Sequence, residues 1–232
     1  MTTDSPVIEH FSGTAGAYDE KNRPLSSIAD TLHFLTALVL QRAPARARVL
    51  CVGVGTGAEV LSLAQSFPEW TFVGVDPARG MLEVCGDRLE QAGVRERCEL
   101  IQGYVQDVPE DESFDIVLNI LVAHFVKRED RPAFYQAMWQ RLRANGFLVS
   151  AEISYDLSAD AFPLMLKNWE TVQSLMGASA ESLDNLPVVL REQLAVISPA
   201  ETAALLEQCG IDMPVWFFQA FMISGWYSIK AG

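Results

Sequence analysis

Residues 48–57 read Arg48-Val49-Leu50-Cys51-Val52-Gly53-Val54-Gly55-Thr56-Gly57, so that an apolar run leads directly into three glycines at alternate positions. A continuous apolar run is typical of a buried parallel strand. Glycines after it permit a tight turn and let the backbone come close to a ligand. Residues 58–66 then have a helical pattern. The stretch predicts the nucleotide-binding element of a doubly wound α/β fold, with the ligand at the N-terminus of the helix.

A second apolar run, residues 71–76, ends in a carboxylate. Asp76 lies 19 residues after Gly57, the spacing expected of an acid that binds both ribose hydroxyls of a nucleotide. The alternative is a helix cap, because Pro77 follows and proline suits a first helical position. The order of strand, turn, helix, strand and acid favours the ribose role.

Strands and helices alternate through residues 46–154, which we predict to be the cofactor-binding core. Alternation of this kind predicts a mostly parallel sheet that is covered on both faces. Residues 198–232 add a helix, which begins with a capping box at Ser198 and Glu201, and two β-like runs. The predicted fold is therefore α/β, with a seven-stranded sheet. Beyond the first two strands and the first helix, the elements expected are strands at 98–102, 114–119, 147–153, 215–221 and 222–230, and helices at 78–92, 130–144 and 199–208.

Two segments stand outside this alternation. Residues 1–45 are predicted to be an N-terminal helical lid segment, with an amphipathic helix from Leu25 to Gln41. The glycine-broken stretch before that helix, residues 11–20, is either a disordered tail or a lid over the ligand. Residues 155–197 have the length of an insertion and predict a helical cap after the fifth strand, at the edge where ligands bind. The alternative for this cap is a packing element or a homodimer contact.

Composition excludes several classes of protein. Half of the 232 residues are hydrophobic, and no apolar run is long enough to cross a membrane. The N-terminus has no basic start followed by an apolar core, so we expect a cytoplasmic protein. The net charge of −13 makes a nucleic-acid partner unfavourable. The four cysteines have no close metal-type spacing and the three histidines do not cluster, so no metal is expected.

Taken together, these segments resemble the class I S-adenosylmethionine-dependent methyltransferases. The resemblance implies a Rossmann-like fold, S-adenosylmethionine as cofactor and methyl transfer to a small-molecule acceptor. Within the family, the likeness is greatest to the branch that carboxymethylates the wobble uridine of transfer RNA. That branch holds a carboxylated cofactor partly with an arginine, and Arg191 is out of register with that position, so only the fold is carried over. The stretches that carry the resemblance are 49–57, 72–81, 103–107, 114–119 and 141–148 for the family, and 18–20, 117–125 and 216–221 for the branch.

The resemblance also implies a set of site residues. Tyr18 would close over the site as a catalytic and cofactor-contacting residue. His124 is the candidate general base, because its ordinary pKa is near neutrality and it follows the fourth strand at the ligand edge; the alternative is a locally bonded histidine. Phe162, Met165 and Trp169 would line an acceptor pocket or pack in the core. The residues expected to bind the cofactor are Tyr18, Gly53, Gly55, Gly57, Asp76, Pro77, Met81, Tyr104, Val105 and Asn119.

Two positions depart from the family pattern. Cys51 stands where many members have an acid, and Tyr104 stands where many have an aspartate that accepts from adenine. Two alternatives outside the family follow. One is a nicotinamide-dependent oxidoreductase, although the glycines here are spaced G-x-G-x-G and not G-x-G-x-x-G. The other is a binding protein that keeps the fold without catalysis.

Overall fold

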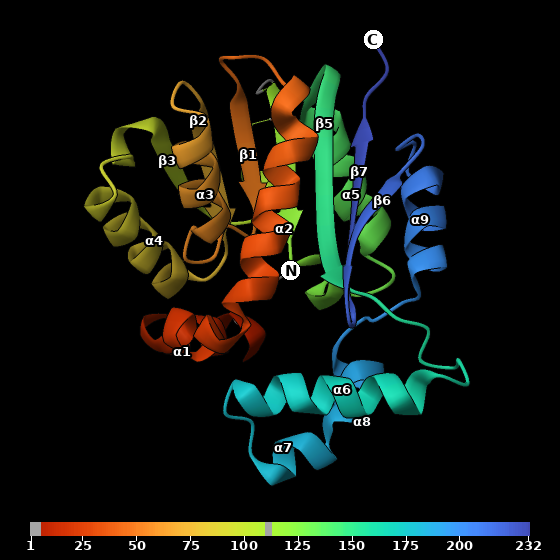
Figure 1. Ribbon diagram of the computed structural model, residues 1–232. Coiled ribbons are helices and arrows are strands. Elements are labelled where there is room, and N and C mark those ends of the chain that lie inside the picture. The colour runs from red at the N-terminus through yellow and green to blue at the C-terminus, as the bar shows by residue number, and fades with distance from the viewer. Residues whose placement is uncertain (1–5, 110–112) are drawn as a thin grey trace.

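The protein is built on one seven-stranded sheet with helices on both faces (Figure 1). The computed structural model describes residues 6–109 and 113–232, and residues 1–5 of the expected lid lie outside it. The strand order is β3-β2-β1-β4-β5-β7-β6, in which β7 runs antiparallel to its neighbours β5 and β6. The predicted α/β fold is therefore confirmed, and its last two strands form the expected hairpin.

The strands are β1 (Arg48–Val52), β2 (Thr71–Asp76), β3 (Cys98–Gln102), β4 (Phe114–Ile120), β5 (Leu142–Ile153), β6 (Val215–Ala220) and β7 (Ile223–Ile229). The helices are α1 (Pro6–Asn22), α2 (Ser26–Val39), α3 (Ala58–Ser66), α4 (Arg79–Gln91), α5 (Arg131–Arg141), α6 (Phe162–Leu175), α7 (Ala180–Asp184), α8 (Leu186–Val188) and α9 (Pro199–Gln208). Short 3-10 turns join several of them.

The buried strand β1 serves two cores at once. Val49 and Cys51 pack into an apolar cluster with α2, α3 and α4 on one face of the sheet. Leu50 and Val52 pack with α5 and α9 on the other face. Successive side chains of a strand point to opposite faces, so a strand that is covered on both faces needs a continuous apolar run. This is why residues 49–52 are apolar without interruption.

The first described helix differs from the sequence expectation. Residues 11–20, for which the sequence left a disordered tail and a lid open, belong to α1, which continues through Gly13 and Gly16. A Cβ atom at either glycine would meet nothing within 4 Å, so both face open space. The helix packs along α4, where Gly80 lets the carbonyl oxygen of Ser12 come close. Packing against α4 therefore overrides the weak helix propensity of the glycines.

A second difference lies between α5 and β5. The helix was expected to run to residue 144, but it ends at Arg141 and the strand begins at Leu142. The buried guanidinium of Arg141 donates to the carbonyl oxygen of Val108, and Leu142 pairs with Phe114 of β4. These long-range contacts fix the chain in an extended form where its local propensity favours helix.

The segment 155–197 forms α6, α7 and α8, at the end of the sheet where the strand β5 ends (Figure 1). Phe162 and Trp169 are buried there in an apolar cluster that includes Leu32 of α2 and Phe218 of β6. Met165 packs against the same cluster. These side chains hold the segment to the rest of the molecule, as the packing alternative expected.

Candidate functional site

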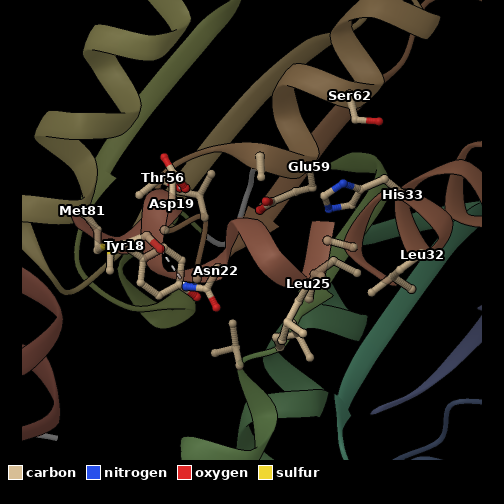
Figure 2. A pocket seen from close by; sticks show the side chains of 18 of the residues that line it. Tyr18, Asp19, Asn22, Leu25, Leu32, His33, Thr56, Glu59, Ser62 and Met81 are labelled. Atoms are coloured by element: carbon tan, nitrogen blue, oxygen red, sulfur yellow. Dashed lines mark hydrogen bonds between the residues drawn. The ribbon is translucent and has the colours of Figure 1, made fainter. Parts of the chain in front are cut away.

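A cavity of about 910 Å³ opens at the carboxyl ends of the strands β1, β2 and β4. Ligands of open α/β sheets bind at this edge. Its walls come from α1, from α2, from the glycine turn with the start of α3, from the end of β2 with α4, and from the loop after β4. Figure 2 shows side chains from these separate elements turned toward one space. The cavity is therefore the candidate site.

The glycine turn forms one end of the cavity. Gly53 and Gly55 line it with left-handed φ angles of +70° and +52°. A Cβ atom at Gly55 would meet nothing within 4 Å, so the space beside it is open to a ligand. Gly57 caps α3 at φ +80° and is not among the lining residues. Glycine adopts such positive φ angles without the steric cost that a Cβ atom brings, which is why three glycines suit this turn.

Asp76 ties the turn to the next helix. Its Oδ2 accepts a hydrogen bond from the backbone N–H of Gly55 at 2.9 Å, and its Oδ1 accepts from that of Ala78 at 2.8 Å. Burial raises the pKa of Asp76, and the two N–H donors lower it in part. Each carboxylate oxygen keeps a second lone pair for a ligand. The capping and ribose-binding roles are thus compatible in this geometry.

Six of the predicted cofactor residues line the cavity, namely Tyr18, Gly53, Gly55, Asp76, Pro77 and Met81. Tyr18 comes from α1, where its ring lies 6.2 Å from that of Phe11 in an edge-to-face arrangement. Phe11 in turn contacts Phe125 of the loop after β4, with ring centroids 5.2 Å apart. These aromatic contacts close one side of the cavity.

Tyr104 and Val105 do not line the cavity, and they start the short turn that follows β3. Val105 is buried in the core between the sheet and α5. The hydroxyl of Tyr104 is buried and has no hydrogen-bond partner within the part of the chain that the structure describes. Their role beside adenine stays a prediction.

Asn119 and His124 are not among the residues that line the cavity, although their neighbours Ile120 and Phe125 are. Asn119 is fully buried and its Nδ2 donates to Ser150 Oγ at 3.1 Å. His124 is 2% exposed, and its Nδ1 accepts from the backbone N–H of Ile153 at 3.3 Å. Burial, and secondarily Arg131, lowers the pKa of His124 to about 3. We therefore withdraw His124 as the candidate base and Asn119 as a ligand contact.

Two titratable side chains in the cavity were missed by the sequence reasoning. Glu59 extends from the first turn of α3, and burial raises its pKa to about 8. His33 comes from α2, and burial lowers its pKa while Asp30 raises it. Figure 2 shows both side chains reaching toward the same space. In the sequence, each of them sits within a helix that has no motif of its own.

The described residues hold no group of three or more His, Cys, Asp and Glu side chains that fits a metal ion. Cys51, Cys85, Cys98 and Cys209 are free thiols and all are buried. Within residues 6–109 and 113–232, no helix has the length and apolar character needed to cross a membrane.

Comparison with known proteins agrees with the site. A methyltransferase domain model matches residues 49–146. The chain is 32% identical to a fatty-acid O-methyltransferase of Mycolicibacterium smegmatis over 67% of this chain and 61% of that protein. It is 22% identical to a carboxy-S-adenosyl-L-methionine synthase of Erwinia tasmaniensis over 100% of this chain and 92% of that protein. This chain belongs to the class I S-adenosylmethionine-dependent methyltransferases. A methyltransferase of this class takes S-adenosylmethionine as its cofactor.

Solved methyltransferases share the fold. An O-methyltransferase family protein from Burkholderia thailandensis superposes with a TM-score of 0.70 at 12% identity, over 97% of this chain and 61% of that chain. The chain thus spans about three fifths of both that structure and the fatty-acid O-methyltransferase. The residues of the cavity fit S-adenosylmethionine, because the open space at Gly55 adjoins the carboxylate of Asp76.

Proposed function

We propose that this methyltransferase transfers a methyl group from S-adenosylmethionine to a neutral, apolar small molecule. The observation that carries the proposal is the lining of the cavity, which is apolar along one side and acidic at the other. The apolar side consists of Val7, Ile8, Phe11, Leu25, Ile28, Leu32, Ile120, Leu121, Val122 and Phe125. An acceptor that buries apolar surface against these side chains gains about 25 cal/mol for each Å².

The charges of the cavity argue against an anionic acceptor. Among the described residues, five acids line it, namely Asp19, Glu20, Asp30, Glu59 and Asp76. The two lining arginines are already paired, Arg23 with Glu20 at 2.7 Å and Arg88 with Asp19 at 3.0 Å. Desolvating a carboxylate without a cation partner is costly. A free fatty acid, the acceptor named for the Mycolicibacterium relative, is therefore disfavoured here.

The acidic lining of the cavity also favours S-adenosylmethionine over its carboxylated form as the cofactor. The guanidinium of Arg191 lies 5.2 Å from the ring centroid of Phe162, and Arg191 does not line the cavity. The net charge of −13 also opposes a transfer RNA acceptor, since nucleic-acid binding depends on clustered Lys and Arg. Neither the carboxymethyl activity nor the RNA substrate of the resembling branch is therefore part of the proposal.

The chain's residues are proposed to position and enclose the reactants. When bound, S-adenosylmethionine supplies a methyl group on a sulfonium, so the protein needs mainly to orient the partners and exclude water. In this proposal Gly53 and Gly55 contact its methionine part, Asp76 its ribose, and Pro77 and Met81 its adenine. Tyr18 closes the cavity, and burial raises the pKa of Tyr18, so its hydroxyl stays protonated.

His33 replaces His124 as the proposed base. Its imidazole lines the cavity, and burial lowers the pKa of His33 below its ordinary value. The neutral form, which accepts a proton, therefore predominates at pH 7. An acceptor that loses a proton from oxygen or nitrogen would give it to this imidazole.

Calorimetry and a labelling assay test the proposal. S-adenosylhomocysteine, the demethylated product, should bind, and NAD should not. Radiolabelled S-adenosylmethionine in a cell extract should label the neutral, organic-soluble fraction, and the labelling should persist at raised salt. Binding of NAD alone would favour the oxidoreductase alternative. Label in carboxylic esters, or in RNA with loss on adding salt, would contradict the neutral small-molecule acceptor.

Assembly and location stay predictions. A homodimer through the cap is consistent with the exposed Leu164 and Leu175 of α6, and sedimentation would test it. The boundaries at residues 45, 154 and 197 follow the changes from lid to core to cap, and limited proteolysis would test them. The cytoplasmic location is equally a prediction.

A further inference from the structure

The cofactor carries an ammonium group on its methionine part, and a carboxylate is its strongest hydrogen-bonding partner where both are withdrawn from water. Among the described residues, five acids line the cavity; three of them have partners and a fourth is exposed to solvent. Asp19 pairs with Arg88, and Glu20 pairs with Arg23. Asp76 accepts from two backbone N–H groups, and Asp30 is exposed on α2. Among the described residues of the lining, this leaves Glu59 as the buried acid without a salt bridge or a hydrogen bond to another residue.

The position of Glu59 suits that task. It occupies the second residue of α3, after the cap Gly57, and therefore lies beside the glycine turn. Figure 2 shows its carboxylate turned into the space between Tyr18 and His33. Among the described contacts, its hydrogen bond is to its own backbone N–H. The side chain thus lies in the cavity without a hydrogen bond to the side chain of any other described residue.

We propose that Glu59 binds the ammonium group of the cofactor. The inference rests on the proposed function and assigns a residue of the same site. Its neighbour Cys51 is a fully buried thiol on β1, and burial, followed by the charge of Glu59, raises the pKa of Cys51 well above its ordinary value. Cys51 therefore contributes no negative charge at neutral pH, and Glu59 supplies from α3 the charge that β1 lacks.

Binding should release a proton. Burial raises the pKa of Glu59 to about 8, with Asp76 adding to the rise and Arg88 opposing it, so the free protein holds Glu59 mostly protonated at pH 7. An ammonium group favours the carboxylate and expels that proton. The charged or titratable groups that face Glu59 are Tyr18 from α1, Cys51 from β1, Asp76 from β2, and Cys85 and Arg88 from α4.

The test compares two ligands and two variants. The ligands are S-adenosylhomocysteine and its analogue in which hydrogen replaces the α-amino group. Glu59→Gln should weaken binding of S-adenosylhomocysteine at least tenfold, which is the scale of one charge-assisted hydrogen bond, and should leave the desamino analogue unchanged. Glu83→Gln is the matched control, because Glu83 pairs with Arg79 on the surface of α4 outside the cavity lining. It should bind both ligands as the parent protein does.

A second readout is the release of a proton when the ligand binds. At pH 7 the binding enthalpy of S-adenosylhomocysteine should depend on the ionisation enthalpy of the buffer, and Glu59→Gln should remove that dependence. Equal weakening of both ligands, or of neither, in folded Glu59→Gln would overturn the role of Glu59. If the parent protein binds neither ligand, the proposed function itself fails.

Discussion

Thr56 Oγ1 donates a hydrogen bond of 2.8 Å to Asp19 Oδ1, which joins the helix α1 to the glycine turn. Arg88 of α4 completes the junction, because its Nη1 lies 3.0 Å from Asp19 Oδ2 and donates to Thr56 Oγ1 at 2.9 Å. Three elements that bound the cavity therefore meet at one carboxylate. The wall formed by α1 is held to the turn by polar contacts as well as by apolar packing.

Asp19→Ala should loosen this wall. The change leaves Thr56 and Arg88 without a common carboxylate, and partly buried charged pairs with good geometry contribute more than exposed ones. We expect faster proteolysis within α1 and at least a severalfold loss of affinity for S-adenosylhomocysteine. Glu9→Ala, in the exposed first turn of the same helix, is the control and should change neither. Unaltered cleavage of Asp19→Ala would mean that apolar packing alone holds α1.

Gly80→Ala should displace α1 from α4. A Cβ atom at Gly80 would lie 2.3 Å from the carbonyl oxygen of Ser12, and a backbone atom has little freedom to move away. Gly86→Ala on the same helix is the control, since its Cβ would meet Leu100 Cδ1 at an ordinary 3.8 Å. Both changes replace a glycine of α4 by the residue with the highest helix propensity. Ligand affinity should therefore fall only in Gly80→Ala, and equal affinities would contradict the contact between α1 and α4.

Asp76→Ala should affect both ligand binding and stability. The change removes the acceptor of the Gly55 and Ala78 N–H groups, and each orphaned buried donor costs about 1–3 kcal/mol. We expect a lower urea midpoint and at least a tenfold loss of affinity for S-adenosylhomocysteine. Asp87→Ala, at an exposed position of α4, should alter neither quantity. A loss of stability with unchanged affinity would assign Asp76 to the capping role alone.

His124 should make the fold sensitive to acid. Because burial lowers the pKa of His124 to about 3, the unfolded chain takes up a proton below pH 6.5 and the folded chain does not. Its contribution to stability is therefore lost as the pH falls from about 6.5 toward 3. By pH 5 the loss is on the order of 2 kcal/mol. His124→Asn, which keeps an acceptor for Ile153, should show a smaller drop between pH 7 and pH 5 in urea unfolding. His10→Asn, at an exposed residue of α1, should behave as the parent protein; if His124→Asn does too, His124 is not buried as a neutral group.

The sequence was informative where one local pattern sets both structure and site. The apolar run and glycines of residues 48–57 predict β1 and the turn, because only glycine takes such φ angles cheaply. The spacing of Asp76 from Gly57 predicts that Asp76 lies at the ligand-binding edge of the sheet, and Asp76 lines the cavity there. Likewise, the capping box at Ser198 and Glu201 correctly predicts the start of α9.

Side-chain direction near a strand end was harder to predict. Asn119 and Ile120 are neighbours in β4, yet Asn119 faces Ser150 and Ile120 lines the cavity, because successive strand side chains alternate. The same holds in the following turn, where Phe125 lines the cavity and His124 is buried. A shift of one residue in the strand register exchanges these roles, and composition alone does not determine that register. Likewise, the helix α1 depends on α4, a partner that lies far along the chain.

The two glycines of α1 have a consequence for how long a ligand stays bound. Each glycine in a helix interior costs about 1 kcal/mol relative to alanine, and both Gly13 and Gly16 have room for a methyl group. The helix α1, which forms one side of the cavity, is thus less stable than the sheet that forms the floor of the cavity. We expect α1 to detach before anything else does, which sets the residence time of the product without disturbing the core. The chain retains two weak positions where alanine would fit, and we expect alanine at both to prolong the residence of the product.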